Sequence, residues 1–137
     1  MENIRILLVD SDDVFLRNCT DYLSVNGYRS LEVRSDCRPP EIERIHDFDC
    51  AVIELCDLID TGLHSIMTVP LSSVILTCRH HTIETERLAR SLRPSVYLVK
   101  PVSFADILSV LFRIAEMKER LQLICEYGLF GSRSGDE

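Results

Sequence analysis

Polar residues that could do chemistry stand at or directly after the ends of short apolar runs in this sequence. Four follow the first run, one lies in the third, and one each ends or follows the fourth and fifth: Asp10, Ser11, Asp12, Asp13, Glu54, Thr77 and Lys100. Carboxylate oxygens bind Mg²⁺, while lysine and hydroxyl groups hold phosphoryl oxygens. The set therefore indicates a site for a phosphoryl group or a hard cation, provided that the fold brings these positions together.

The apolar runs and the patterns between them predict alternating strands and helices. Strands are expected at residues 4–9, 28–33, 50–55, 73–77 and 96–99. Helices are expected at about residues 12–26, 39–46, 82–92 and 103–125, with at most a short helix after Gly62. Repeated strand–helix units predict an α/β protein with a doubly wound parallel sheet and helices on both faces. The polar residues then gather at the carboxyl ends of the strands, where such sheets bind ligands.

Four segments also fill the motif positions of a known family. The chain resembles the receiver (response-regulator) domains of two-component signalling over about residues 4–120, through LLVDSDD, VIELCDLIDTG, VILTC and YLVKP. The resemblance implies the flavodoxin-like strand order 2-1-3-4-5 and Mg²⁺-assisted phosphoryl transfer from a histidine kinase to a third-strand aspartate. It also implies that Thr77 and Lys100 sense the phosphoryl group, that Tyr97 is a switch residue, and that the Lys100–Pro101 bond is cis.

Two residues depart from the family pattern at positions that carry its chemistry. Glu54, eight residues before Gly62, stands where the phosphoaccepting aspartate is expected, and its extra methylene displaces the carboxylate from the attack geometry. Ser11 stands at a direct metal-ligand position and removes one negative charge from it. We therefore expect that Glu54 is not phosphorylated. The Mg²⁺ site of Asp10, Ser11 and Glu54, with Asp12 nearby, is expected to be weakened or lost, and no cofactor is expected beyond weakly bound Mg²⁺.

Glu54 can instead act as a fixed negative charge. Its side chain is long enough to reach Lys100, and we predict an ion pair that holds the domain in one conformation. An alternative is that Asp57 or Asp60, in the expected loop after the third strand, accepts the phosphoryl group. Only 23 residues separate Glu54 from Thr77, so the third helix is expected to be short or partly unwound.

The bulk composition bounds the class of protein. The 137 residues fit one domain, expected at residues 1–125, with a polar flexible tail at 126–137. The net charge of −7 argues against direct nucleic-acid binding, because an acidic surface is repelled by phosphate backbones. The sequence has neither a signal-peptide pattern nor an apolar run of membrane-spanning length, and a cytoplasmic, bacterial protein is expected.

The six cysteines, at positions 19, 37, 50, 56, 78 and 125, form no CxxC pair and no ligand-like spacing with the four histidines. Cys19, Cys50 and Cys125 lie in apolar-periodic segments and are expected to be small hydrophobic side chains. The main interpretation is structural thiols in a reducing cytosol, with redox sensing or metal binding as the alternatives. His80 and His81 are expected in a solvated loop.

These observations favour a signalling module without catalytic turnover, and not an enzyme. The partner, a histidine kinase or an output domain, is expected to bind the face formed by helix 82–92, strand 96–99 and the last helix. That last helix runs past the expected sheet cover, and the sequence does not choose between homodimerisation and a connection to an output domain. Two alternatives stay open: a working phosphoacceptor and the amino-terminal part of a DNA-binding regulator.

Overall fold

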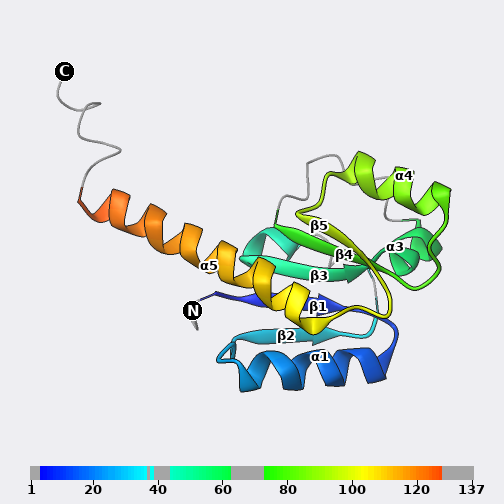
Figure 1. The fold of residues 1–137 in the computed structure, drawn as a ribbon, viewed down its shortest axis with the longest axis horizontal. Coiled ribbons are helices and arrows are strands. Elements are labelled where there is room, and N and C mark those ends of the chain that lie inside the picture. The colour runs from blue at the N-terminus through cyan, green and yellow to red at the C-terminus, as the bar shows by residue number, and fades with distance from the viewer. Residues whose placement is uncertain (1–3, 37, 39–43, 63–72, 128–137) are drawn as a thin grey trace.

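A five-stranded parallel sheet forms the centre of the computed structural model, which describes residues 4–36, 38, 44–62 and 73–127. The strands are β1 (Ile6–Val9), β2 (Leu31–Arg34), β3 (Cys50–Glu54), β4 (Val74–Cys78) and β5 (Val96–Val99). Their order across the sheet is β2-β1-β3-β4-β5 (Figure 1). This confirms the predicted fold class and strand order, and each strand overlaps the run that predicted it.

The three central strands are buried on both faces, which explains why their sequences are almost uniformly apolar. Every residue of β1, β3 and β4 is buried, including Glu54 and Thr77, whereas the edge strands β2 and β5 are partly exposed. A buried charge without a partner is strongly destabilising. The buried polar residues at the strand ends must therefore be paired with one another.

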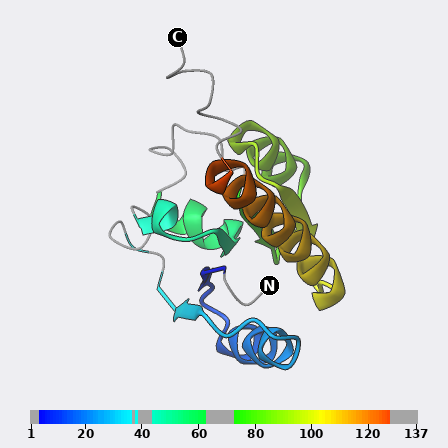
Figure 2. The same cartoon turned by 90° about the vertical axis from the view of Figure 1, so that its left-hand side faces the viewer.

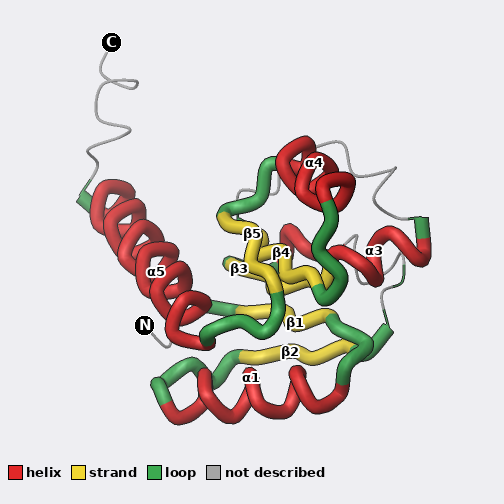
Figure 3. The backbone as a smooth tube through the Cα atoms, turned by 45° about the vertical axis from the view of Figure 1, so that its right-hand side comes forward, coloured by secondary structure: helices red, strands yellow, loops and turns green. Residues whose placement is uncertain are grey.

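Helices cover both faces of the sheet, as predicted (Figures 1 and 2). They are α1 (Asp13–Val25), α3 (Leu55–Thr61), α4 (Ile83–Leu92) and α5 (Phe104–Glu126), with a short 3₁₀ helix η1 (Arg44–Asp47). Cys19 of α1 and Leu111 of α5 share the core on one face, and Leu58 of α3 and Ala89 of α4 share the core on the other. The second half of α5 extends past the sheet (Figure 3), in agreement with the long last helix that was expected.

The segment after β3 differs from the prediction. The strand ends one residue earlier than expected and α3 begins at once, so Asp57 and Asp60 lie in a helix and not in a loop. The Glu54 carboxylate caps this helix by accepting a hydrogen bond from the Cys56 N–H, and Gly62 ends it with a φ of 76°. The predicted shortness of the third helix is confirmed at seven residues. Any helical residues after Gly62 lie outside the described part of the chain.

Packing against the sheet explains the early start of α3. Leu55, Leu58 and Ile59 repeat at helical intervals, and the two leucines are fully buried against the sheet. Leu55 also continues the apolar run of β3, so the sequence alone predicts that Leu55 belongs to the strand.

Other expected segments fall partly outside the described residues. Of the helix expected at 39–46, only the 3₁₀ helix from Arg44 is described, because 39–43 lie outside. The helix α5 ends at Glu126, the first residue of the expected tail, and 128–137 lie outside as well. Within the described residues, none of the helices combines the length and the apolarity needed to cross a bilayer.

Candidate functional site

Asp10 and Lys100 form a close ion pair at the carboxyl ends of β1 and β5. Lys100 Nζ lies 2.6 Å from Asp10 Oδ2, and Asp10 is buried. Burial raises the pKa of Asp10 above its ordinary value and outweighs the effect of Lys100. Burial alone would lower the pKa of Lys100, but the adjoining carboxylates of Asp10 and Glu54 raise it overall. Lys100 is therefore a charged ammonium shared by two carboxylates, and its bond to Pro101 is cis, as expected.

Glu54 is completely buried, and both oxygens of its carboxylate are occupied by donors. Oε2 accepts hydrogen bonds from the backbone N–H groups of Cys56 at 3.1 Å and Arg79 at 3.0 Å. Oε1 accepts a hydrogen bond from Thr77 Oγ1 at 3.2 Å and lies 3.2 Å from Lys100 Nζ. The predicted ion pair between Glu54 and Lys100 is therefore present. Thr77 and Lys100 both meet the carboxylate at the position where the family carries an aspartate.

Arg79, directly after β4, brings a second cation to these carboxylates. Its Nη2 lies 2.9 Å from Asp57 Oδ1 and 3.6 Å from Asp60 Oδ2, and its Nη1 lies 3.9 Å from Glu54 Oε2. Nη1 is buried and has no hydrogen-bond partner among the described residues. The guanidinium thus lies among three carboxylates. Sequence reasoning missed Arg79, because nothing in its spacing distinguishes it from a surface arginine.

Asp57 faces the position of Ser11. The Ser11 N–H donates to Asp57 Oδ2 at 2.8 Å, and the Ser11 hydroxyl donates to Oδ1 at 2.9 Å. Asp12 instead caps α1, because its side chain accepts hydrogen bonds from the N–H groups of Val14 and Phe15. Ser11 is therefore part of the site through its hydrogen bonds to Asp57, whereas the Asp12 carboxylate caps α1. We use the term strand-end cluster for Asp10, Ser11, Glu54, Asp57, Thr77, Arg79 and Lys100.

The donor set of the strand-end cluster does not fit Mg²⁺. This ion needs oxygen ligands in near-octahedral geometry and usually keeps several waters. The carboxylate of Glu54 already accepts from backbone and hydroxyl donors, and the Ser11 hydroxyl is itself a donor to Asp57. Arg79 places a cationic nitrogen 3.9 Å from Glu54 Oε2, which repels an incoming cation. The weakening of the metal site stays a prediction, and Arg79 adds a second reason for it.

Tyr97 connects β5 to the start of α4. Its hydroxyl lies 2.8 Å from His81 Nδ1 and 3.2 Å from Thr85 Oγ1. Burial raises the pKa of Tyr97 to about 12, so the hydroxyl keeps its proton at neutral pH. His81 is exposed, as expected for a solvated loop, but it also contacts Tyr97, which no sequence pattern indicates.

Tyr97→Phe should lower the free energy of unfolding by about 1 kcal/mol, which is typical for one lost hydrogen bond. The ring keeps its packing, so the loss comes from the hydroxyl contacts. Urea denaturation measures the change, and a double-mutant cycle with His81→Ala is the control. If the two losses simply added, the hydroxyl–imidazole contact would contribute nothing to stability.

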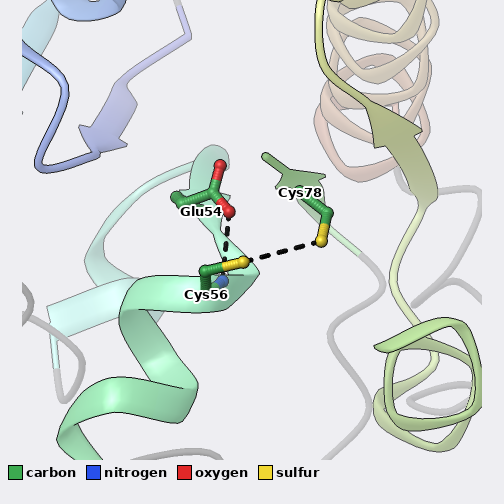
Figure 4. A group of neighbouring side chains, drawn as sticks. All are labelled: Glu54, Cys56 and Cys78. Atoms are coloured by element: carbon green, nitrogen blue, oxygen red, sulfur yellow. Dashed lines mark hydrogen bonds between the residues drawn. The ribbon is translucent and has the colours of Figure 1, made fainter. Parts of the chain in front are cut away.

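Two cysteines lie beside Glu54 on neighbouring elements. The Sγ atoms of Cys56 and Cys78 are 3.7 Å apart (Figure 4). Cys78 is fully buried and Cys56 is half-buried. Burial raises the pKa of Cys56 to about 11. The sequence gives no spacing signal for this pair.

The remaining described cysteines divide into two groups. Cys19 and Cys50 are fully buried, as expected for structural thiols, and burial raises the pKa of each to about 12. Cys125 is exposed, so the expectation that it packs as a small hydrophobic side chain is wrong. The reason is that it lies on the second half of α5, which extends past the sheet.

Comparisons with known proteins identify the fold as that of response-regulator receiver domains. Neither the family models nor the curated proteins gave a match. A CheY-like receiver domain from Methanospirillum hungatei is 19% identical with a TM-score of 0.62, covering 85% of this chain and 98% of its own. The receiver domain of a DNA binding response regulator from Colwellia psychrerythraea is 17% identical, with a TM-score of 0.65 and coverages of 83% and 99%. A Burkholderia pseudomallei response regulator, with a phosphorylated aspartic acid, a calcium ion and citrate, is 19% identical, with a TM-score of 0.63 and coverages of 88% and 74%.

Proposed function

We propose that this chain is an atypical receiver-like domain that signals through protein–protein contacts, without phosphorylation at Glu54 and without catalytic turnover. The observation that carries the proposal is the occupied carboxylate of Glu54, which meets Cys56, Thr77, Arg79 and Lys100. A carboxylate nucleophile must present a lone pair to phosphorus in line with the leaving group. Here each oxygen already faces two donors.

The charges around Glu54 support a signalling state that is set by the sequence. A phosphoryl group adds about −1.5 to −2 units of charge, and a glutamate carboxylate supplies roughly half of that. This negative charge lies against Thr77 and Lys100, whose counterparts sense the phosphoryl group in the family that the chain resembles. Arg79 supplies positive charge among the carboxylates, where the family uses a metal ion. In the strand-end cluster, Glu54 therefore supplies negative charge in place of a phosphoryl group, and Arg79 supplies positive charge in place of a metal ion.

Asp57 and Asp60 are weaker candidates for phosphorylation. Both oxygens of Asp57 are used, by Ser11 and by Arg79. The Asp60 side chain is 71% exposed and lies 3.6 Å from Arg79. Neither carboxylate is presented free of the arginine, so we do not assign a phosphoryl acceptor among them.

The face formed by α4, β5 and α5 is the proposed partner surface. Each of these elements exposes a large apolar side chain: Ile83 at 66%, Val99 at 44% and Phe112 at 44%. The proposed partner is a histidine kinase, an output domain or a second copy of this chain, acting in the cytoplasm. The net charge of −7 favours a protein partner over nucleic acid.

Acetyl phosphate tests the proposal directly. Native protein incubated with acetyl phosphate and Mg²⁺ should keep its intact mass, whereas a receiver domain with an aspartate at this position should gain one phosphoryl group. A stoichiometric gain in this chain would overturn the proposal. The variants Glu54→Gln, Asp57→Asn and Asp60→Asn would then identify the acceptor.

A further inference from the structure

We propose that Cys56 and Cys78 form a reversible disulfide on exposure to a peroxide, so that the strand-end cluster responds to oxidation. The pair is a second input to the same site, and it does not depend on whether Glu54 accepts a phosphoryl group. The proposal rests on the contact between two sulfur atoms, their unequal exposure and their position beside Glu54.

Adjacent elements hold the two thiols together. Glu54 and Thr77 are register partners across β3 and β4, and each cysteine lies one or two residues beyond them. The Sγ atoms are 3.7 Å apart (Figure 4), in contact but not bonded. A disulfide bond is about 2.0 Å long, so bonding requires a closure of roughly 1.7 Å. Cys56 lies in the first turn of the short helix α3, where side-chain rotation and a small shift can supply that movement.

The two thiols differ in exposure, as a reacting thiol and a resolving thiol do. Cys56 is half-buried and lines a cleft of about 340 Å³ that α3, the loop after β4 and the start of α4 enclose. Arg79 and His80 are also at this cleft. Cys78 is fully buried behind Cys56. A small peroxide therefore reaches Cys56 first, and because burial raises the pKa of this thiol to about 11, its oxidation should become faster as the pH rises.

The chemistry balances with one peroxide and two thiols. The peroxide oxidises the Cys56 thiol to a sulfenic acid; the O–O bond breaks, and for hydrogen peroxide the second oxygen leaves as water. The Cys78 sulfur then attacks the sulfenic sulfur, an S–S bond replaces the S–O bond, and a second water carries away the Cys78 proton. Two electrons pass from the thiols to the peroxide. A dithiol reverses the reaction by exchange.

The disulfide would act on the donors that hold Glu54. The N–H groups of Cys56 and of Arg79, the residue after Cys78, both donate to Glu54 Oε2. Drawing Cys56 towards Cys78 shifts these two donors relative to the carboxylate that they share.

Metal binding by Glu54, Cys56 and Cys78 is the alternative to a disulfide. Glu54, Cys56 and Cys78 bring one ligand atom each within 4.8 Å of one another. The geometry favours the disulfide, because the Glu54 oxygens already accept from several donors. Lys100 and Arg79 also place positive charge within 4 Å of that carboxylate, and this opposes a divalent cation.

Stepwise oxidation of native protein with hydrogen peroxide tests the proposal. The intact mass should fall by two hydrogens and return after treatment with dithiothreitol. Trypsin alone leaves Cys50, Cys56 and Cys78 in one peptide, because no lysine or arginine lies between Arg44 and Arg79. Cleavage before Asp57 separates Cys56 from Cys78, and cleavage after Glu54 separates Cys56 from Cys50. The expected map joins the Cys56 and Cys78 fragments.

Matched variants sharpen the result. Cys125→Ser, at an exposed position, should keep the disulfide, whereas Cys56→Ser and Cys78→Ala should abolish it. The map of wild-type protein is decisive even if a variant folds poorly. The proposal is overturned if Cys56 and Cys78 stay free while Cys125 is oxidised, or if the bond joins another pair. Stoichiometric zinc in the native mass spectrum, with no disulfide after oxidation, would also overturn it.

Discussion

Replacing Glu54 with alanine should lower the free energy of unfolding by about 3 kcal/mol, the lower end of the range for breaking a buried ion pair. The substitution leaves Lys100 with Asp10 alone and removes the acceptor for the N–H groups of Cys56 and Arg79. Loss of the charged acceptor is costly because the donors are part-buried or buried. Asp10 still neutralises Lys100, which keeps the loss near the lower end. Urea denaturation followed by circular dichroism measures the difference.

Two variants separate the charge of Glu54 from its volume. Glu54→Gln keeps the volume but turns an amide N–H₂ towards some of the donors, so most of the loss should persist. Glu119→Ala on the exposed side of α5 removes the same charge from the surface and should change stability by less than about 0.5 kcal/mol. If Glu54→Gln were as stable as wild type, the negative charge of Glu54 would not contribute to the free energy of unfolding.

The part of the site that follows from topology could be predicted from the sequence. Asp10, Glu54, Thr77 and Lys100 each end or follow an apolar run, and parallel strands place such positions at one edge whatever the side-chain details. The close contact of Lys100 with Glu54 then requires only the reach of two long side chains. These residues were found because backbone order alone brings them together.

Arg79 and Asp57 could not be found in this way, because their roles depend on where α3 begins. An apolar residue after Glu54 is compatible with either a longer strand or a helix. Only the helix turns Asp57 towards Ser11, where it accepts two hydrogen bonds and receives the guanidinium of Arg79. Local spacing does not distinguish these outcomes; the packing of Leu58 against the sheet decides between them.

The contact of Cys56 with Cys78 depends on strand register in the same way. The two residues are 22 positions apart, and they meet because β3 and β4 pair with Glu54 opposite Thr77. A search for closely spaced cysteines cannot detect a pair that forms across two strands. The sequence therefore does not reveal which side chains meet beyond the ends of the strands.

The variant with Ser11→Asp, Glu54→Asp and Arg79→Ala together should accept a phosphoryl group from acetyl phosphate in the presence of Mg²⁺. On the sequence alone, the first two substitutions suffice, because they restore the nucleophile and one metal ligand. Arg79 changes this expectation, since its guanidinium lies 2.9 Å from Asp57 and 3.9 Å from Glu54. Positive charge there opposes Mg²⁺. The double variant should therefore keep its intact mass while the triple variant gains one phosphoryl group.

Further measurements test whether Arg79 is the residue that prevents phosphorylation of the double variant. Adding Lys100→Met to the triple variant should abolish the gain, because the phosphoryl oxygens then lose their ammonium partner. Thermal melts must show that each variant is folded before its mass is interpreted. A double variant that is phosphorylated as fully as the triple variant would show that Arg79 does not exclude the metal. A folded triple variant that binds Mg²⁺ but stays unmodified would show that restoring the metal site does not by itself restore phosphoryl transfer.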